Sequence, residues 1–143
     1  MTQLAASILG LDIGTKRIGV AKAYWPNGIA YPLTTLTNDE DFMFRLEEII
    51  QQYNIKALIA GKPRNLNGQE TEQTAYCVDF AEQIKNETQL PVYLEDEALT
   101  SVDAEQELKD RGVAYSREDI DALSAAHILD SFISSHSKGV NIG

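Results

Sequence analysis

The order of apolar and polar positions along the chain predicts a mixed α/β fold. Short apolar runs separated by turn residues predict three successive strands, at residues 7–13, 18–24 and 29–33. Because their connections are short, these strands are expected to form an antiparallel meander. Pro32 favours an edge position for the third strand, since proline cannot donate a hydrogen bond to a neighbouring strand.

The period then changes to that of a helix. Apolar side chains recur at helical spacing at Phe42, Leu46, Ile49, Ile50 and Tyr53. Thr37 and Glu40 stand before them in the register of a capping box. A loop is predicted at 61–68, two further strands at 55–60 and 91–94, and three further helices at 70–88, 100–112 and 119–135.

Right-handed crossovers would make the two later strands parallel to the first. The prediction is therefore a five-stranded mixed sheet, three strands antiparallel and then two parallel, flanked by helices. A chain of 143 residues with 43% hydrophobic and 24% charged residues suits one domain, spanning 1–143. The N-terminal segment has no basic residue and meets Asp12 early, so neither a signal peptide nor a membrane span is expected and the protein should be cytoplasmic. The single cysteine, Cys77, excludes an internal disulfide and suits a buried apolar position.

The net charge of −10 argues against a nucleic-acid-binding protein when it is taken over the whole chain, since phosphate affinity comes from Lys and Arg. Its distribution changes this picture. Residues 69–110 hold two basic and twelve acidic side chains, a net charge of −10, whereas residues 1–38 carry +2. The acidity is thus expected on a solvated helical face, with the loops locally basic.

Three polar segments follow predicted strands, and sites in parallel sheets form beyond the carboxyl ends of strands. These segments are residues 12–15, 61–65 and 95–97. Asp12 is the strongest candidate, because it lies inside an apolar run where an ionised carboxylate needs a metal, a base or hydrogen-bond donors. The alternative is a carboxylate that caps the turn at Gly14.

Acidic side chains are prominent at the end of the fifth predicted strand and at the start of the last predicted helix. Alternation along the strand sends Glu95 and Glu97 to one side and Asp96 to the other. Carboxylates close to Asp12 would repel one another without a cation, and Mg²⁺ or Mn²⁺ prefers such oxygen ligands. Asp121 begins the last predicted helix and is followed by small alanines that would let this helix pack closely. The alternatives are a solvated charge run at 95–97 and an acid that only stabilises a helix first turn.

Basic and amide side chains accompany the acids. Contacts to nucleic-acid phosphates are expected from Lys16, Arg17, Lys62, Arg64 and Asn65. His127 lies about one and a half turns beyond Asp121, off its helical face, and is expected to be a hydrogen-bonded core histidine.

Four blocks together resemble the YqgF (RuvX) family of Holliday-junction resolvases and nucleases that mature the 16S rRNA precursor. They are LGLDIGTKRIGVA (9–21), GKPRNLNG (61–68), EDEALTSVDAE (95–105) and DALSAAHIL (121–129). The resemblance implies a ribonuclease-H-like fold with strand one central and a catalytic, metal-binding triad of Asp12, Glu97 and Asp121. It also implies two Mg²⁺ or Mn²⁺ ions at the scissile phosphate and hydrolysis that leaves a 5′ phosphate and a 3′ hydroxyl.

Two departures from the family pattern remove positive charge. Ala98 stands where the family usually has arginine, and the stretch 116–120 before Asp121 is acidic rather than basic. Processing of the 16S rRNA precursor is the expected role. The alternatives are resolution of Holliday junctions in DNA and a non-catalytic RNA-binding factor in ribosome assembly; a phosphotransferase, suggested by Asp-Ile-Gly-Thr at 12–15, would need a second domain. No heptad pattern indicates a stable dimer, so a monomer or weak homodimer is expected.

Overall fold

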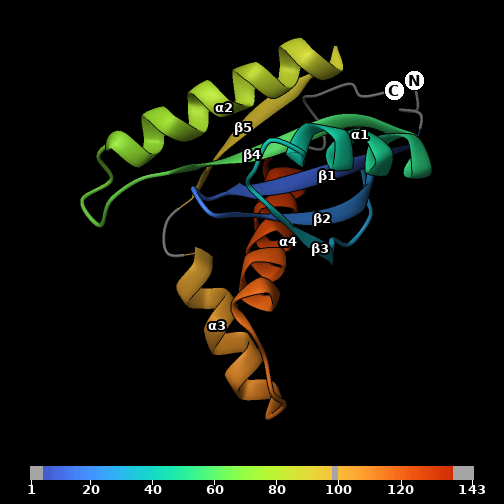
Figure 1. The fold of residues 1–143 in the computed structure, drawn as a ribbon. Coiled ribbons are helices and arrows are strands. Elements are labelled where there is room, and N and C mark those ends of the chain that lie inside the picture. The colour runs from blue at the N-terminus through green and yellow to red at the C-terminus, as the bar shows by residue number, and fades with distance from the viewer. Residues whose placement is uncertain (1–4, 98–99, 137–143) are drawn as a thin grey trace.

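The computed structural model describes residues 5–97 and 100–136, and its centre is a five-stranded sheet in the order β3-β2-β1-β4-β5 (Figure 1). The strands are β1 (Ala6–Ile13), β2 (Arg17–Trp25), β3 (Tyr31–Thr37), β4 (Ile55–Pro63) and β5 (Val92–Glu97). β1 pairs antiparallel with β2 and parallel with β4. The predicted mixed sheet, with its first strand at the centre, is confirmed.

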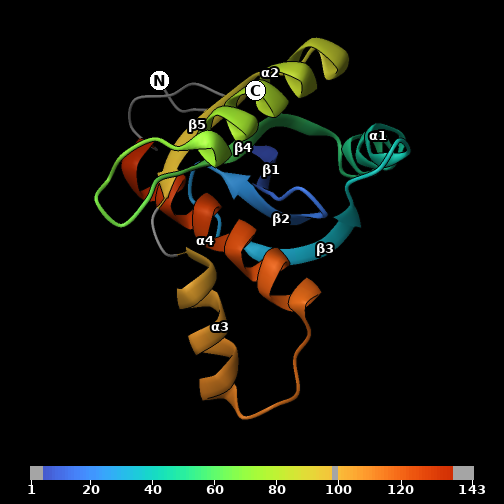
Figure 2. The same cartoon turned by 60° about the vertical axis from the view of Figure 1, so that its left-hand side comes forward.

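The helices lie on both faces of this sheet. They are α1 (Phe42–Tyr53), α2 (Glu72–Thr88), α3 (Thr100–Arg111) and α4 (Arg117–His136). α1 and α2 cover one face and α4 crosses the other, while α3 packs alongside α4 away from the sheet (Figure 2). None of the helices in the described part of the chain has the length and apolarity that crossing a membrane requires.

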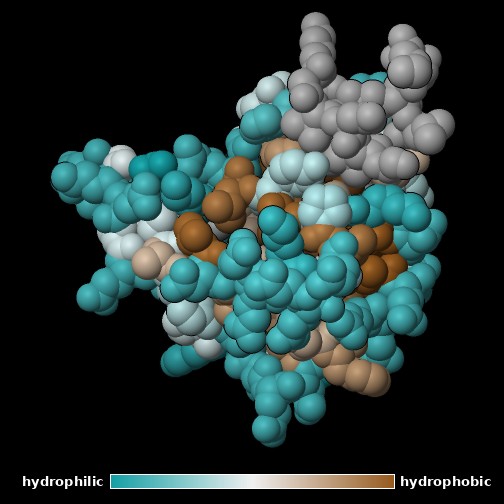
Figure 3. All heavy atoms as spheres, turned by 90° about the horizontal axis from the view of Figure 1, so that it is seen from above, coloured by the Kyte–Doolittle hydropathy of each residue, from teal (hydrophilic) through white to brown (hydrophobic). Residues whose placement is uncertain are grey.

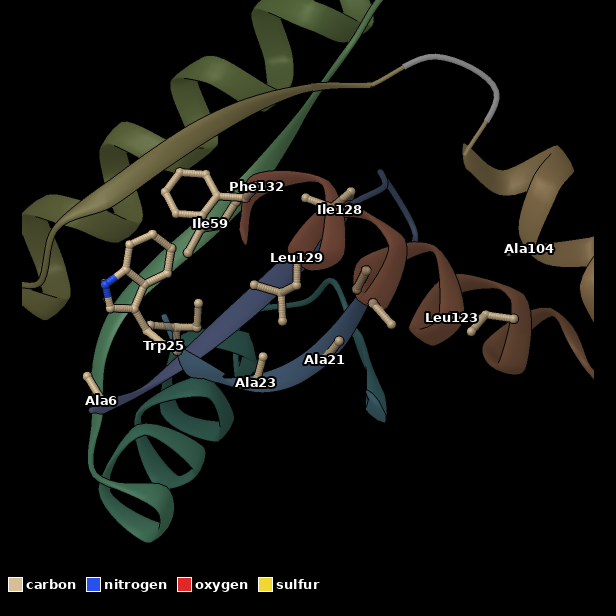
Figure 4. Packing of buried hydrophobic residues seen from close by; sticks show 14 of the residues in the cluster. Ala6, Ala21, Ala23, Trp25, Ile59, Ala104, Leu123, Ile128, Leu129 and Phe132 are labelled. Atoms are coloured by element: carbon tan, nitrogen blue, oxygen red, sulfur yellow. The ribbon is translucent and has the colours of Figure 1, made fainter. Parts of the chain in front are cut away.

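Alternation along the strands gives each face its own apolar core. Leu9 and Val20 point towards α1 and α2, where they join a cluster of buried residues that includes Cys77. Trp25 points to the opposite face, where its ring lies 5.5 Å from that of Phe132 on α4 (Figure 4). Alternate residues of a strand therefore pack against helices on opposite faces of the sheet.

Part of the acidic excess lies on the outer face of α2, as predicted. Cys77, Ala81 and Ile84 are buried on the inner face of this helix, whereas its acids Glu72, Asp79, Glu82 and Glu87 are exposed. Figure 3, seen from above, shows the hydrophilic surface that α2 presents to solvent.

The expected capping box at Thr37 and Glu40 is wrong. β3 continues to Thr37, which pairs with Arg17 of β2, so the backbone of Thr37 belongs to the sheet, and the helix begins only at Phe42. A capping box occurs instead at the start of α2, between Thr71 and Thr74. The third strand also begins later than expected, and Ile29 lies outside it and is exposed.

Two other boundaries differ from the sequence prediction. The segment predicted as a loop from residue 61 begins as strand, because β5 extends to Glu97 and pairs β4 as far as Pro63. The last helix starts at Arg117, which puts Asp121 in its second turn and not at its beginning. Both elements are longer than their apolar patterns, since pairing and packing partners extend them.

Glycines on β1 and β2, at positions 10 and 19, allow α4 to lie very close to the sheet. A Cβ atom on Gly10 would be 2.5 Å from Leu129 Cγ and 2.7 Å from the carbonyl oxygen of Ala125. A Cβ atom on Gly19 would overlap the carbonyl group of Asp121. The helix contributes alanines to the same contact, among them the buried Ala122, as the sequence predicted.

We expect Gly19→Ala to lower the free energy of unfolding by about 1–3 kcal/mol, because backbone of α4 must move to accommodate the methyl group. Urea denaturation measures the change. Gly68→Ala is the comparison for backbone strain without a steric clash: nothing lies within 4 Å of its Cβ position, and only its positive φ of 76° opposes alanine, at a cost of about 1–2 kcal/mol. A Gly19→Ala protein as stable as the wild type would show that the close approach is not required.

Candidate active site

Asp12, Glu97 and Asp121 are brought to one end of the sheet by three separate elements. Asp12 stands next to the last residue of the central strand β1 and is paired across the ladder with Gly19. Because Gly19 has no side chain, the backbone of Asp121 rests directly on it. On the other side of β1, the Glu97 carboxyl carbon lies 2.9 Å from where a Cβ atom on Gly61 would be.

The three carboxylates share one electrostatic environment. The pKa of Asp12 is raised to about 8, first by burial, then by the charge of Glu97 and then by the charge of Asp121. Two of these carboxylates also affect Cys77: burial first, and then the charges of Glu97 and Asp12, raise the pKa of its thiol to about 12. The thiol is therefore protonated and unreactive at neutral pH, as its predicted role as a buried apolar residue requires.

Arg17 provides the positive charge nearest to this group. Its Nε donates to Asp121 Oδ2 at 2.7 Å, and this hydrogen bond is the main reason that the pKa of Arg17 is raised. The pair is partly buried and links the start of β2 to α4. Arg17 thus holds Asp121 in this structure, and its expected contact with nucleic acid stays a prediction.

The chemistry of the three acids suits a hard divalent cation, since they offer only carboxylate oxygens. Among the residues that the structure describes, however, no three His, Cys, Asp or Glu side chains are arranged to hold one metal ion. Asp121 is turned to Arg17 rather than shared with the other two acids. The three acids are therefore close enough to interact electrostatically. Metal ligation by Asp12, Glu97 and Asp121 stays a prediction.

Two of the other four residues expected to contact phosphate have acidic partners. Lys62 pairs with Glu70 at 3.4 Å, and Arg64 pairs with Asp96 at 3.2 Å. The Asn65 side chain accepts hydrogen bonds from the backbone of residues 67 and 69, and so shapes the loop between β4 and α2. Lys16 is exposed in the turn after Asp12.

The acids at the end of β5 divide as the strand period predicted. Asp96 faces Arg64, whereas the buried Glu95 accepts a 2.6 Å hydrogen bond from Ser131 Oγ on α4. His127 lies 3.3 Å from Glu107 of α3, which agrees with a hydrogen-bonded histidine that supports the fold. Ala98, where the family pattern has arginine, lies outside the described residues.

Sequence patterns did not indicate two features of the site. Gly61 was grouped with a loop, yet in the strand it leaves the space that the Glu97 carboxylate occupies. Ser124 is one turn beyond Asp121, and its Oγ is buried without a hydrogen-bond partner in the part of the chain described. Its serine-alanine context resembles ordinary helix packing, and no sequence signal distinguishes it.

This fold, with carboxylates gathered at the end of its central strand, defines the ribonuclease-H-like class to which the RuvC resolvases belong. The structure of Thermus thermophilus RuvC in complex with a Holliday junction substrate superposes with a TM-score of 0.56 over 92% of this chain and 97% of that chain, at 16% identity. A second structure of the same protein gives a TM-score of 0.57 at 14% identity. These similarities establish the fold.

The family follows from the sequence comparisons. Residues 6–135 match the family model RuvX, described as Holliday junction resolvase, and the chain belongs to this family. Proteins named "Putative pre-16S rRNA nuclease" are 38% identical in Methylobacillus flagellatus, over 87% of this chain and 88% of the relative, and 37% identical in Desulforudis audaxviator, over 94% and 98%. Family and fold together support a hydrolase that acts on nucleic acids.

We expect Asp12→Asn to stabilise the metal-free protein increasingly as the pH rises. An unfolded aspartate has a pKa of about 3.9, so between that pH and about 8 the folded wild type keeps a proton that the unfolded chain has released. Wild-type stability therefore falls through this window, by on the order of 1 kcal/mol per pH unit, while asparagine has no charge to bury. Urea denaturation in EDTA at pH 5, 7 and 9 measures the difference.

The matched control is Asp96→Asn, which removes an exposed carboxylate of the same strand end. Its stability relative to wild type should not change between pH 5 and pH 9. An equal pH dependence for both variants would mean that burial of Asp12 beside two acids does not govern the effect.

Proposed function

We propose that this chain is a divalent-metal-dependent endonuclease that hydrolyses phosphodiester bonds during 5′-end processing of the 16S rRNA precursor. The observation that carries the proposal is the convergence of Asp12, Glu97 and Asp121, from β1, β5 and α4, with the half-buried Asp12 close enough to the other two for their charges to raise its pKa. Such a concentration of negative charge is costly in a folded protein and is relieved by a cation.

Each residue of the triad would contribute differently to the reaction. Asp12 lies on the central strand, where it pairs with Gly19 of β2 and follows Leu11, which pairs with Ala60 of β4, so it would be the most rigid of the three ligands. Glu97 and Asp121 would complete the oxygen donor set from either side of it. A bound divalent cation supplies charge neutralisation at the phosphate and acidifies a water molecule. Arg17 holds Asp121 and lies where it can also attract the phosphate of a substrate.

Two observations bear on the substrate. The curated relatives carry the name of a pre-16S rRNA nuclease, whereas the family model carries the description of a Holliday junction resolvase. The outer face of α2 is acidic, and Lys62 and Arg64 already have acidic partners. A large duplex surface would meet few uncompensated cations there, so we favour the precursor rRNA and keep the four-way DNA junction as the second candidate.

We expect the wild-type protein to cleave a 5′ fragment of precursor 16S rRNA in the presence of Mn²⁺, and Asp12→Asn to reduce the rate at least about 100-fold, because the cation that would stabilise the transition-state charge loses a carboxylate ligand. Gel analysis of end-labelled RNA beside a labelled four-way junction measures both activities. Asp96→Asn is the control and should cleave at close to the wild-type rate.

The substrate that is cut decides between the two roles. Cleavage of the junction alone would replace the rRNA proposal with junction resolution. Equal rates for wild type and Asp12→Asn would overturn the assignment of the site. Absence of cleavage on both substrates, with RNA still bound, would indicate a non-catalytic RNA-binding factor.

We expect millimolar Mn²⁺ or Mg²⁺ to raise the Tm of the wild type at pH 8, because an ion that binds only the folded state stabilises it by mass action. The shift should be much smaller in Asp12→Asn and retained in Asp96→Asn. Differential scanning fluorimetry measures it. Identical shifts in all three proteins would place the ion elsewhere.

A further inference from the structure

A lysine enclosed by tyrosine rings lies near the far end of β2 from the candidate active site. Lys22 Nζ is 3.8 Å from the centre of the Tyr24 ring, 5.4 Å from that of Tyr53 and 5.7 Å from that of Tyr31. The rings come from β2, the end of α1 and the start of β3. These four residues are called the tyrosine–lysine cluster below.

Within residues 5–97 and 100–136, Lys22 has no acidic partner. Lys22 is 2% exposed. A buried ammonium group without an acidic partner is expensive, and here the faces of the aromatic rings offset part of the cost. Most basic groups near the candidate active site have carboxylate partners, so this part of the acidic protein stands out as cationic.

The rings around this charge face solvent. Tyr24 is 57% exposed and Tyr31 is 42% exposed, although each has Lys22 close to its ring. Beside them a hollow of about 200 Å³ is lined by Tyr24, Tyr53, Asn54, Lys56 and residues 5–7, and its lining includes a second lysine and no acid. Aromatic surface with uncompensated positive charge is the combination that binds single-stranded nucleic acid.

We infer that the tyrosine–lysine cluster binds a single-stranded segment of the RNA substrate, with bases stacked on Tyr24 and Tyr31. The Lys22 ammonium fixes the Tyr24 ring and draws the phosphate backbone electrostatically, and Lys56 adds a cation at the rim. A duplex would not fit this chemistry, because its bases are already stacked on one another. The inference rests on the proposed function for the identity of the nucleic acid.

The position of the cluster separates it from the reaction. Tyr24 is seven residues along β2 from Arg17, or about 23 Å at about 3.3 Å per residue. Lys22 and Tyr24 also project to the α1 face, whereas Gly19 faces α4. The cluster would therefore hold nucleotides several positions away from the scissile phosphate, and contribute to affinity and to the choice of single-stranded flanks.

The test measures RNA binding without cleavage. Fluorescence anisotropy with a labelled single-stranded RNA, in the Asp12→Asn background, should give a Kd about 5- to 100-fold weaker for Tyr24→Ala, since each base stacked on an aromatic ring contributes to this extent. Tyr24→Phe keeps the ring and should retain most of the affinity. Phe44→Ala is the matched control, because Phe44 is a 67% exposed aromatic residue on α1 outside the cluster.

Three outcomes would overturn the inference: equal affinity of the parent and Tyr24→Ala, equal losses for Tyr24→Ala and Phe44→Ala, or no binding of single-stranded RNA by the parent. Thermal denaturation of each variant shows whether a loss of affinity comes from unfolding. Binding is measured in a protein that lacks Asp12, so failure here leaves the cleavage result untouched. Conversely, a protein that binds through Tyr24 and never cleaves would retain the cluster and lose the nuclease proposal.

Discussion

The contact between α4 and the glycines of β1 and β2 is the constraint on which the candidate site depends. Helices ordinarily pack on sheets through side chains on both surfaces, which keeps their backbones apart. Here Gly10 and Gly19 remove the side chains on the sheet, and alanines remove them on the helix. Asp121 thereby reaches the ladder position opposite Asp12, although 109 residues separate them in the chain. Without this approach, α4 would cover the core but leave its carboxylate outside the site.

This packing creates an electrostatic cost that ordinary core packing does not. Glu97 and Asp121 lie close to the half-buried Asp12, and the pKa of Asp12 is raised by its burial and by their charges. Arg17 neutralises only one of them. Local destabilisation of this kind is typical of sites that await a charged ligand, because the strain is relieved when the ligand binds. The apolar layers on both faces of the sheet supply the stability that allows it.

The sequence predicted the order of the elements and the acidic outer face of α2, because both depend on local periodicity, whereas the central position of the first strand followed from the family resemblance. It also indicated Asp12, since a carboxylate inside an apolar run is unusual on physical grounds alone. Glu97 and Asp121 were singled out firmly only through the family resemblance. The features that it missed depend on partners from elsewhere: β3 absorbs Thr37 through pairing with β2, and β4 extends because β5 does. Likewise, the acids that neutralise Lys62 and Arg64 lie on other segments, and spacing does not identify them.

Both faces of the same sheet carry concentrated charge of one sign. Three acids meet on the α4 face, and on the α1 face the Lys22 ammonium lies against aromatic rings, with no ion pair to a carboxylate among the described residues. A nucleic-acid strand with its cations could satisfy both, since it brings metal to the acids and phosphates and bases to the lysine and tyrosines. Strand β2 joins the two places through consecutive residues of alternating direction, so their separation is fixed by backbone geometry rather than by flexible loops. Under the proposed function, the distance between a strand bound at the tyrosines and the carboxylates would therefore be set by β2 itself.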